Sequence, residues 1–380
     1  MTVRILATLA IAALVTAAQA AEPDARSRAV HESLLVLDSH LDAPMLFGLE
    51  GWNVLERHSV KGDGTQLDYP RMVAGGLDGG FFATYIPQGP LTDAGRAGAR
   101  DAALLRLQEI HQLVAAHPEK FELAYKADDA ARIAAAHRRS VYLSMENGYP
   151  LGLDLTLLKT YYTLGVRIAG PVHFLNNDLG DSSTDPKGAQ WHGLSPLGKD
   201  YVREANRLGI LLDASHSSDD VFDQMLELSR TPILLSHSGT RAVFDHPRNL
   251  DDARLRRLAA SGGVIQISAY NDYMITNERN ADRNAAIAGL RRAAGRSLAQ
   301  RATVQRQIAA VDEKYPLRRA TLDDFMQHLL HAIELAGIDH VGIGIDFDGG
   351  GGVTGLEDVA DYPKITARLL RAGYKRDDLQ

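Results

Sequence analysis

The sequence predicts an α/β protein that folds as a (β/α)8 TIM-like barrel, and three observations support this fold class. Eight short runs of consecutive apolar residues recur along the 380-residue chain, as expected of parallel strands that are covered on both faces. Stretches with helical periodicity lie between most of these runs. No low-complexity linker divides the chain after residue 20, which favours one barrel over several domains.

The predicted strands are bounded by polar residues or glycine, and they comprise residues 34–37, 81–86, 141–145, 167–173, 209–213, 232–235, 263–269 and 340–345. The predicted helices comprise residues 101–116, 153–163, 195–208, 218–229, 251–260 and 321–336. Several helices open on a capping residue, such as Ser195 before a proline and Ser218 and Thr321 before acidic first turns. Eight strands alternating with helices indicate a closed barrel rather than an open doubly wound sheet.

Two stretches interrupt the alternation. Residues 50–73 are glycine-rich and irregular, and residues 271–319 form a polar segment rich in alanine and arginine. The second stretch predicts a helical insertion after strand 7. In a barrel both stretches leave strand ends on the face that carries active sites. We therefore weigh a solvated helical hairpin against a lid or a dimer arm, and a homodimer is one expectation.

The N-terminus resembles a secretory signal peptide. Arg4 is followed by an apolar run over residues 5–15 and by the small-residue site Ala18-Gln19-Ala20. The run is shorter than the roughly 20 residues needed to cross a bilayer, and no later segment reaches that length. We therefore expect residues 1–20 to be removed and residues 21–380 to form a single barrel domain. The expected location is periplasmic or secreted, without a stable membrane anchor.

Composition excludes some functions and restricts the chemistry of others. The chain has 41 Lys and Arg against 48 Asp and Glu, a formal charge of −7, no cysteine and 14 histidines. No clustered basic stripe is present, so no nucleic acid partner is expected. Without thiols, metal or nucleophile chemistry must use imidazole, carboxylate or hydroxyl groups.

Potential metal ligands follow six of the predicted strands. They are His40 and Asp42, Glu146, His173, His216, His237 and Asp346. One such residue alone is more often a turn residue or a helix cap. Because the carboxyl ends of barrel strands meet at one mouth, six occurrences at the same ends predict a common site.

The donor types suit zinc. Imidazoles and carboxylates without thiolates bind Zn²⁺ well, with Mn²⁺, Co²⁺ and Fe²⁺ as competitors that the sequence does not exclude. Three histidines with Asp42 and Glu146 exceed the needs of one four-coordinate ion that keeps an open position. Two ions bridged by Glu146 would use them all. A calcium loop over residues 346–357 is a weaker alternative, because it has no Asp or Asn at its fifth position and follows a strand instead of a helix.

The residues that carry a family resemblance extend over nearly the whole chain after the predicted signal peptide. They include Asp38-Ser39-His40-Leu41-Asp42, Asp213-Ala214-Ser215-His216, Ser236-His237-Ser238, His246-Pro247-Arg248-Asn249-Leu250 and Gly344-Ile345-Asp346-Phe347-Asp348-Gly349. With this ordered set, the chain resembles the membrane (renal) dipeptidase family of zinc peptidases.

The resemblance implies a role for each matching residue. His40 and Asp42 would bind one Zn²⁺ and His216 and His237 the other, with Glu146 bridging two ions per chain. His173 would contact the substrate and steady the tetrahedral intermediate. Arg248 would hold the substrate carboxylate, and Asp346 would transfer the proton.

The implied function is hydrolysis of the peptide bond of dipeptides, including dipeptides with a C-terminal D-residue. Two alternatives stay open: a related metal-dependent amidohydrolase acting on a lactam or an N-acyl amino acid, and an exported metal-binding or peptide-binding protein without turnover.

The sequence also departs from the family pattern. Asn147 follows Glu146 where the family usually has glycine, so altered substrate contacts are expected nearby. The insertion from Asn271 is longer than in typical relatives. The chain ends at Gln380 where relatives continue through a further helix, so a truncated C-terminus is one expectation.

Overall fold

The computed structural model describes residues 22–278, 280–293 and 295–380, so the predicted signal peptide lies outside the described residues. The strands are β1 Leu37–Leu41, β2 Gly79–Tyr85, β3 Phe121–Leu123, β4 Arg139–Glu146, β5 Val166–Ala169, β6 Leu211–Leu212, β7 Leu234–Thr240, β8 Asn249–Leu250, β9 Val264–Ile267 and β10 Val341–Ile343. Neighbouring strands pair in parallel, in the orders β1-β2-β4-β5-β6 and β10-β9-β7-β8, with β3 beside β4.

Two junctions close these sheets into a barrel. Asp213, just after β6, pairs in parallel with Leu234 of β7, and Ala214 N donates to Leu234 O at 2.8 Å. On the other side, Leu41 of β1 pairs with Phe347 beyond β10. The result is a ring of eight parallel strands, with β3 and β8 as short additions. The predicted (β/α)8 barrel is confirmed.

Strand boundaries differ from prediction where polar residues are buried. The first strand was predicted to end at Leu37, but β1 begins there and continues through Asp38 and His40, which are both buried. In the same way β7 continues past Leu235 to Thr240, and all of its residues are buried. The apolar runs therefore mark where these strands lie, while their C-terminal halves consist of polar residues that hydrogen bonds and neighbouring charges accommodate.

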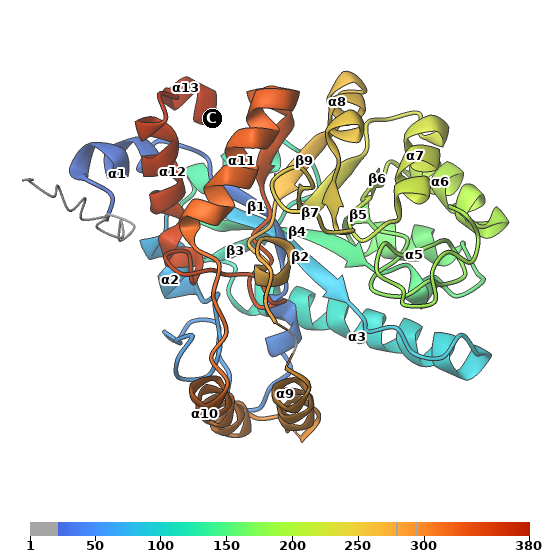
Figure 1. Cartoon of the computed structure of the whole chain (residues 1–380), viewed down its shortest axis with the longest axis horizontal. Coiled ribbons are helices and arrows are strands. Elements are labelled where there is room, and N and C mark those ends of the chain that lie inside the picture. Colours follow the sequence, from blue (N-terminus) through green and yellow to red (C-terminus); the bar gives the residue numbers. More distant parts are fainter. Residues whose placement is uncertain (1–21, 279, 294) are drawn as a thin grey trace, which may run out of the picture.

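Helices surround the strands (Figure 1). They are α1 Ala25–Glu32, α2 Tyr69–Ala74, α3 Asp93–Ala116, α4 Asp129–Ala135, α5 Leu157–Thr163, α6 Pro196–Leu208, α7 Asp219–Leu228, α8 Asp252–Ala260, α9 Ala281–Ala293, α10 Leu298–Lys314, α11 Leu322–Ala336, α12 Tyr362–Arg371 and α13 Arg376–Leu379. The expected caps are present: Ser195 accepts from Gly198 N, Ser218 accepts from Val221 N, and Thr321 forms a capping box with Asp324. Among the helices of the described residues, none has the length and apolar character needed to span a membrane.

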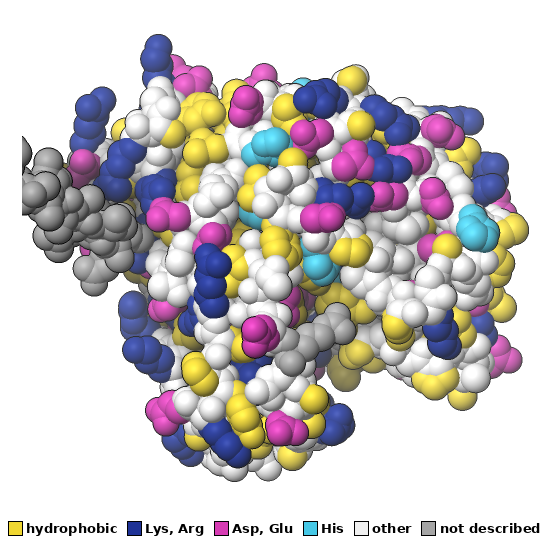
Figure 2. Space-filling model, in the orientation of Figure 1, with side chains coloured by type: hydrophobic (Ala, Val, Ile, Leu, Met, Phe, Trp, Pro, Cys, Tyr) yellow, Lys and Arg dark blue, Asp and Glu magenta, His cyan; other side chains and the backbone are white. Residues whose placement is uncertain are grey.

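The helical insertion after the seventh barrel strand is a hairpin of α9 and α10. It protrudes from the body as a separate lobe (Figures 1 and 2), and among its described residues only Ile287 is buried. The hairpin is attached to the loop after β1, because Ser297 pairs with Glu50 and Arg301 Nε donates to Asp63 O at 2.7 Å. This attachment places the hairpin beside the loops that follow the strands. A lid or dimer-arm role stays a prediction.

Candidate metal centre

Four strand ends bring the predicted metal ligands together. His40 lies in β1, and Asp42 follows this strand. Glu146 is the last residue of β4, and His237 lies in β7. His216 follows β6 in a left-handed backbone conformation with φ of 66°. All five side chains are buried, so the barrel encloses five potential ligands that are far apart in sequence.

The carboxylate of Glu146 lies between two groups of ligands. Its Oε2 is 3.5 Å from His40 Nε2, and His40 Nε2 is 3.4 Å from Asp42 Oδ2. Its Oε1 is 3.0 Å from His216 Nε2 and 3.4 Å from His237 Nε2. One oxygen thus faces the pair from β1, and the other faces the pair from the β6 and β7 ends.

Two buried atoms of the β1 pair support a cation at this position. Within the described part of the chain, His40 Nε2 and Asp42 Oδ1 are buried and have no hydrogen-bond partner. Buried polar atoms without partners are rare in native proteins because each costs free energy. A divalent cation would satisfy both atoms, and three imidazoles with two carboxylates are a donor set that suits zinc.

The residues behind His237 determine which of its ring nitrogens carries the proton. Ser236 Oγ donates to Asp213 Oδ2 at 2.5 Å, so it has only lone pairs left for His237 Nδ1, which is 2.8 Å away. Nδ1 must therefore carry the proton and donate it to Ser236. The lone pair of Nε2 then faces His216 Nε2, at 2.8 Å, and Glu146 Oε1, at 3.4 Å, so it points to the centre of the ligand cluster, as in a metal-ligating histidine.

The pKa directions of the imidazoles also suit metal binding. Burial lowers the pKa of His216 and of His237 well below the usual range, so both rings are neutral, as metal ligands must be. Burial alone would also lower the pKa of His40, but Glu146 and Asp42 raise it well above the ordinary value. A cation at this position would take the place of that proton.

Asp346 lies on the side of the site where the carboxylates gather. It follows β10 with φ of 72°, and its Oδ1 is 4.0 Å from His40 Nε2. Burial and the charge of Asp42 raise its pKa well above the usual range. A Cβ at Gly349 would overlap the carboxylates of Asp42 and Asp346, so only glycine leaves space for both.

Asp348 points to different partners. Its carboxylate accepts hydrogen bonds from the backbone N–H groups of Gln66, at 2.8 Å, and Leu67, at 3.1 Å. The carboxylates of Asp346 and Asp348 therefore do not converge on one point, which disfavours the calcium-loop alternative.

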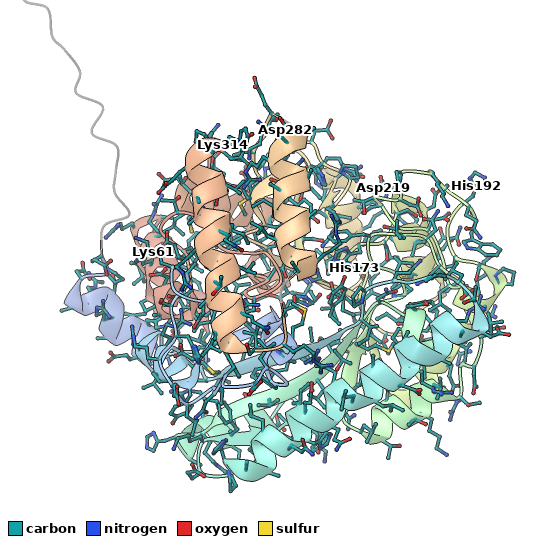
Figure 3. The ribbon with its side chains drawn as sticks, turned by 90° about the horizontal axis from the view of Figure 1, so that it is seen from below. Lys61, His173, His192, Asp219, Asp282 and Lys314 are labelled. Carbon is teal, nitrogen blue, oxygen red and sulfur yellow. The ribbon has the colours of Figure 1, made fainter. Side chains whose placement is uncertain are left out.

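His173 follows β5 and faces the same site, with Nε2 3.5 Å from Glu146 Oε1. In the view of Figure 3 it lies to the right of the lower end of α9, between the hairpin and α3. Burial is the largest cause that lowers its pKa. A neutral imidazole that lines the cavity can donate one hydrogen bond to a bound molecule.

Arg248 is a buried cation that has no acidic partner among the residues that the structure describes. Its Nη1 donates to Ser238 Oγ at 3.2 Å and its Nη2 to His237 O at 2.9 Å. Nε is buried without a hydrogen-bond partner, and no carboxylate of the described residues lies within salt-bridge distance. The guanidinium also lies 5.2 Å from the ring centre of Tyr273. A buried guanidinium without a counter-ion is suited to bind an anionic group of a ligand.

The sequence-based interpretation missed the apolar walls of the cavity that is also lined by Asp42, Glu146, His173, His216, His237 and Asp346. Its apolar and aromatic lining comprises Met45, Tyr85, Phe174, Tyr270 and Tyr273, with Gly349 beside them. A signal for two of them was present, because Phe174 adjoins His173 and Tyr270 follows the seventh barrel strand. The others come from positions that no local pattern distinguishes from core residues.

Asn147 does not line this cavity. It has φ of 69°, a conformation that asparagine tolerates better than most residues. Its Oδ1 accepts from Tyr149 N and from Asn177 Nδ2, each at 3.1 Å, and its Nδ2 donates to Ile86 O at 3.2 Å. The side chain therefore connects three loops beside Glu146 instead of contacting a ligand.

Comparison with known proteins identifies the family. The model of the membrane dipeptidase family (peptidase family M19) matches residues 24–380. Dipeptidase tcpJ of Claviceps purpurea is 30% identical over 319 residues, which cover 83% of this chain and 66% of that protein. The crystal structure of the probable dipeptidase PvdM from Pseudomonas aeruginosa is 31% identical, with a TM-score of 0.78 and 93% of each chain covered.

A third match is a metallopeptidase from Rhodobacter sphaeroides, whose crystal structure holds a phosphinate mimic of the dipeptide L-Ala-D-Ala. It is 27% identical, with a TM-score of 0.69, and the match covers 90% of this chain and 93% of that one. The match of the family model over residues 24–380, together with these relatives, shows that the chain belongs to the membrane dipeptidase family, peptidase family M19.

Proposed function

We propose that this protein is an exported dipeptidase that uses two zinc ions per chain to hydrolyse the peptide bond of dipeptides. The observation that carries the proposal is the position of Glu146, whose two oxygens face separate ligand groups. His40 and Asp42 would hold one ion, His216 and His237 the other, and Glu146 both. The signal-like residues 1–20 support export to the periplasm or the medium.

The chain's own residues suit the steps of amide hydrolysis. When bound, two zinc ions would lower the pKa of a shared water and polarise the scissile carbonyl. Asp346 would accept the proton of the attacking water and deliver it to the leaving amine. His173 would donate a hydrogen bond to the carbonyl oxygen as negative charge develops there.

Substrate length would be set by Arg248. Its guanidinium would pair with the terminal carboxylate of the substrate. Arg248 Nη2 donates to the backbone carbonyl of His237, and Nε2 of His237 lies 3.4 Å from Glu146 Oε1, so one residue connects Arg248 to Glu146. A dipeptide brings one amide and one terminal carboxylate to two such points. The metallopeptidase from Rhodobacter sphaeroides binds a phosphinate mimic of L-Ala-D-Ala, and we extend this tolerance for a C-terminal D-residue to the present chain as part of the proposal.

Arg248→Met is expected to raise KM by about 10–100-fold for dipeptides with a free carboxylate, because it removes a charge-assisted contact. For a dipeptide with a C-terminal amide, KM should be nearly the same in the variant as in the wild type. Steady-state kinetics on the two substrates measure the difference. Arg241→Met is the matched control, since Arg241 pairs with Asp219 at 2.8 Å outside the cavity. Equal losses on both substrates would contradict the proposed clamp.

A further inference from the structure

The cavity above the metal ligands has one exposed apolar wall. Among its apolar lining residues, Phe174 alone counts as exposed, at 41%, whereas Tyr273 is 8% exposed. Removing apolar surface from water is favourable, so a bound apolar group that covers the exposed part of Phe174 would bind more tightly. This exposure distinguishes Phe174 from the buried aromatic residues of the core.

Phe174 is held in a defined position. Its ring centre lies 4.0 Å from that of His173 and 5.3 Å from that of His216, with an edge-on approach to the latter. Its carbonyl accepts from Thr184 Oγ1 at 3.2 Å, and the carbonyl of the preceding His173 accepts from Ser182 Oγ at 2.5 Å. The hydrogen bonds hold the backbone of this segment, and the ring contacts place Phe174 against the two histidines at the wall of the cavity.

The wall lies on the Arg248 side of the site. Phe174 packs against His216, whose Nε2 lies 2.8 Å from Nε2 of His237, and the backbone carbonyl of His237 accepts a hydrogen bond from Arg248 Nη2. Asp42 and Asp346 lie instead beside His40, on the other side of Glu146. A dipeptide with its terminal carboxylate on Arg248 and its amide above Glu146 would therefore carry its C-terminal residue past Phe174.

We propose that Phe174 is a specificity-determining residue that selects dipeptides with an apolar side chain on the C-terminal residue. This inference rests on the proposed dipeptidase function and adds the substrate class to it. An apolar side chain would cover the exposed ring and be covered by it, whereas glycine would leave the ring in water and a charged side chain would lose solvation against it.

The test compares Ala-Leu and Ala-Gly as substrates of the wild type, Phe174→Ala, Phe174→Leu and Leu175→Ala. Leu175 is the matched control, because it is 39% exposed beside Phe174 and does not line the cavity. Phe174→Ala should lower kcat/KM for Ala-Leu by about tenfold, mainly through KM, and change Ala-Gly by less than about twofold. Phe174→Leu should restore most of the loss, and Leu175→Ala should leave both substrates unchanged.

A binding measurement distinguishes a failure of the Phe174 inference from a failure of the dipeptidase proposal. Phosphinate analogues of Ala-Leu and Ala-Gly are titrated calorimetrically into the zinc-loaded protein. The wild type should bind the Ala-Leu analogue more tightly than the Ala-Gly analogue, and Phe174→Ala should lose this difference in affinity. If the wild type hydrolyses both dipeptides but Phe174→Ala weakens both equally or neither, the inference is wrong and the dipeptidase proposal stands. If the wild type hydrolyses no dipeptide and binds neither analogue, both are wrong.

Discussion

Asp346→Asn is expected to lower kcat by about 10²–10⁴-fold on a dipeptide while the protein keeps its metal. The amide has nearly the shape of the carboxylate and fits beside Gly349, but it cannot accept the proton of the attacking water. KM should change little, because Asp346 would act on the attacking water and not on the terminal carboxylate of the substrate. Stopped-assay kinetics with elemental analysis of the same preparation measure both quantities.

Asp348→Asn is the matched control in the same sequence motif. Its carboxylate accepts hydrogen bonds from the backbone N–H groups of Gln66 and Leu67. The variant should therefore lower the free energy of unfolding, while kcat falls by less than about tenfold. Two outcomes would contradict the role of Asp346. A kcat within about threefold of the wild type would exclude proton transfer, and a loss of bound metal would make Asp346 a ligand.

Glu146→Gln is expected to give the largest effect, with metal content falling from two ions per chain to one or fewer and kcat falling by more than about 10³-fold. Glutamine offers one oxygen and an N–H group, so it can face the β1 pair or the β6 and β7 pair, but not both. The buried histidines would also lose the negative charge that lies within 3.5 Å of His40, His173, His216 and His237.

Zinc analysis after dialysis and the zinc-induced rise in unfolding temperature measure this loss. The stabilisation by zinc follows from its affinity for the folded state, so weaker binding reduces the rise. Glu227→Gln on the exposed face of α7 is the control and should behave as the wild type. Retention of two ions with normal stabilisation in Glu146→Gln would show that Glu146 does not bridge.

The barrel and the ligand positions could be predicted because both depend on local features of the sequence. Apolar runs such as the one before Asp38 mark the strands, and the topology of a barrel brings the residues after each run to one mouth. His40 and Asp42 share a face because side chains in a strand alternate. The convergence on Glu146 needed only the order of strands, which parallel βα units largely fix.

Other features depend on contacts between distant segments, which no local pattern reports. Pairing of Leu41 with Phe347 closes the barrel across more than 300 residues, and polar residues continue β1 and β7 because their partners come from other strands. The hydrogen bond from Arg301 to the loop at Asp63 likewise could not be predicted from the sequence of either segment. Phe174 could be noticed beside His173, but its exposure and its contact with His216 required the folded chain.

The most direct test of the central claim is a zinc titration of metal-free protein, followed by hydrolysis of Ala-Leu at each addition. The two-ion account predicts that activity rises to a plateau at two equivalents of zinc per chain, with little turnover at the first. Elemental analysis at the plateau should also give two ions. A plateau at one equivalent would contradict the binuclear centre, and zinc-replete protein without hydrolysis of any dipeptide would contradict the proposed function.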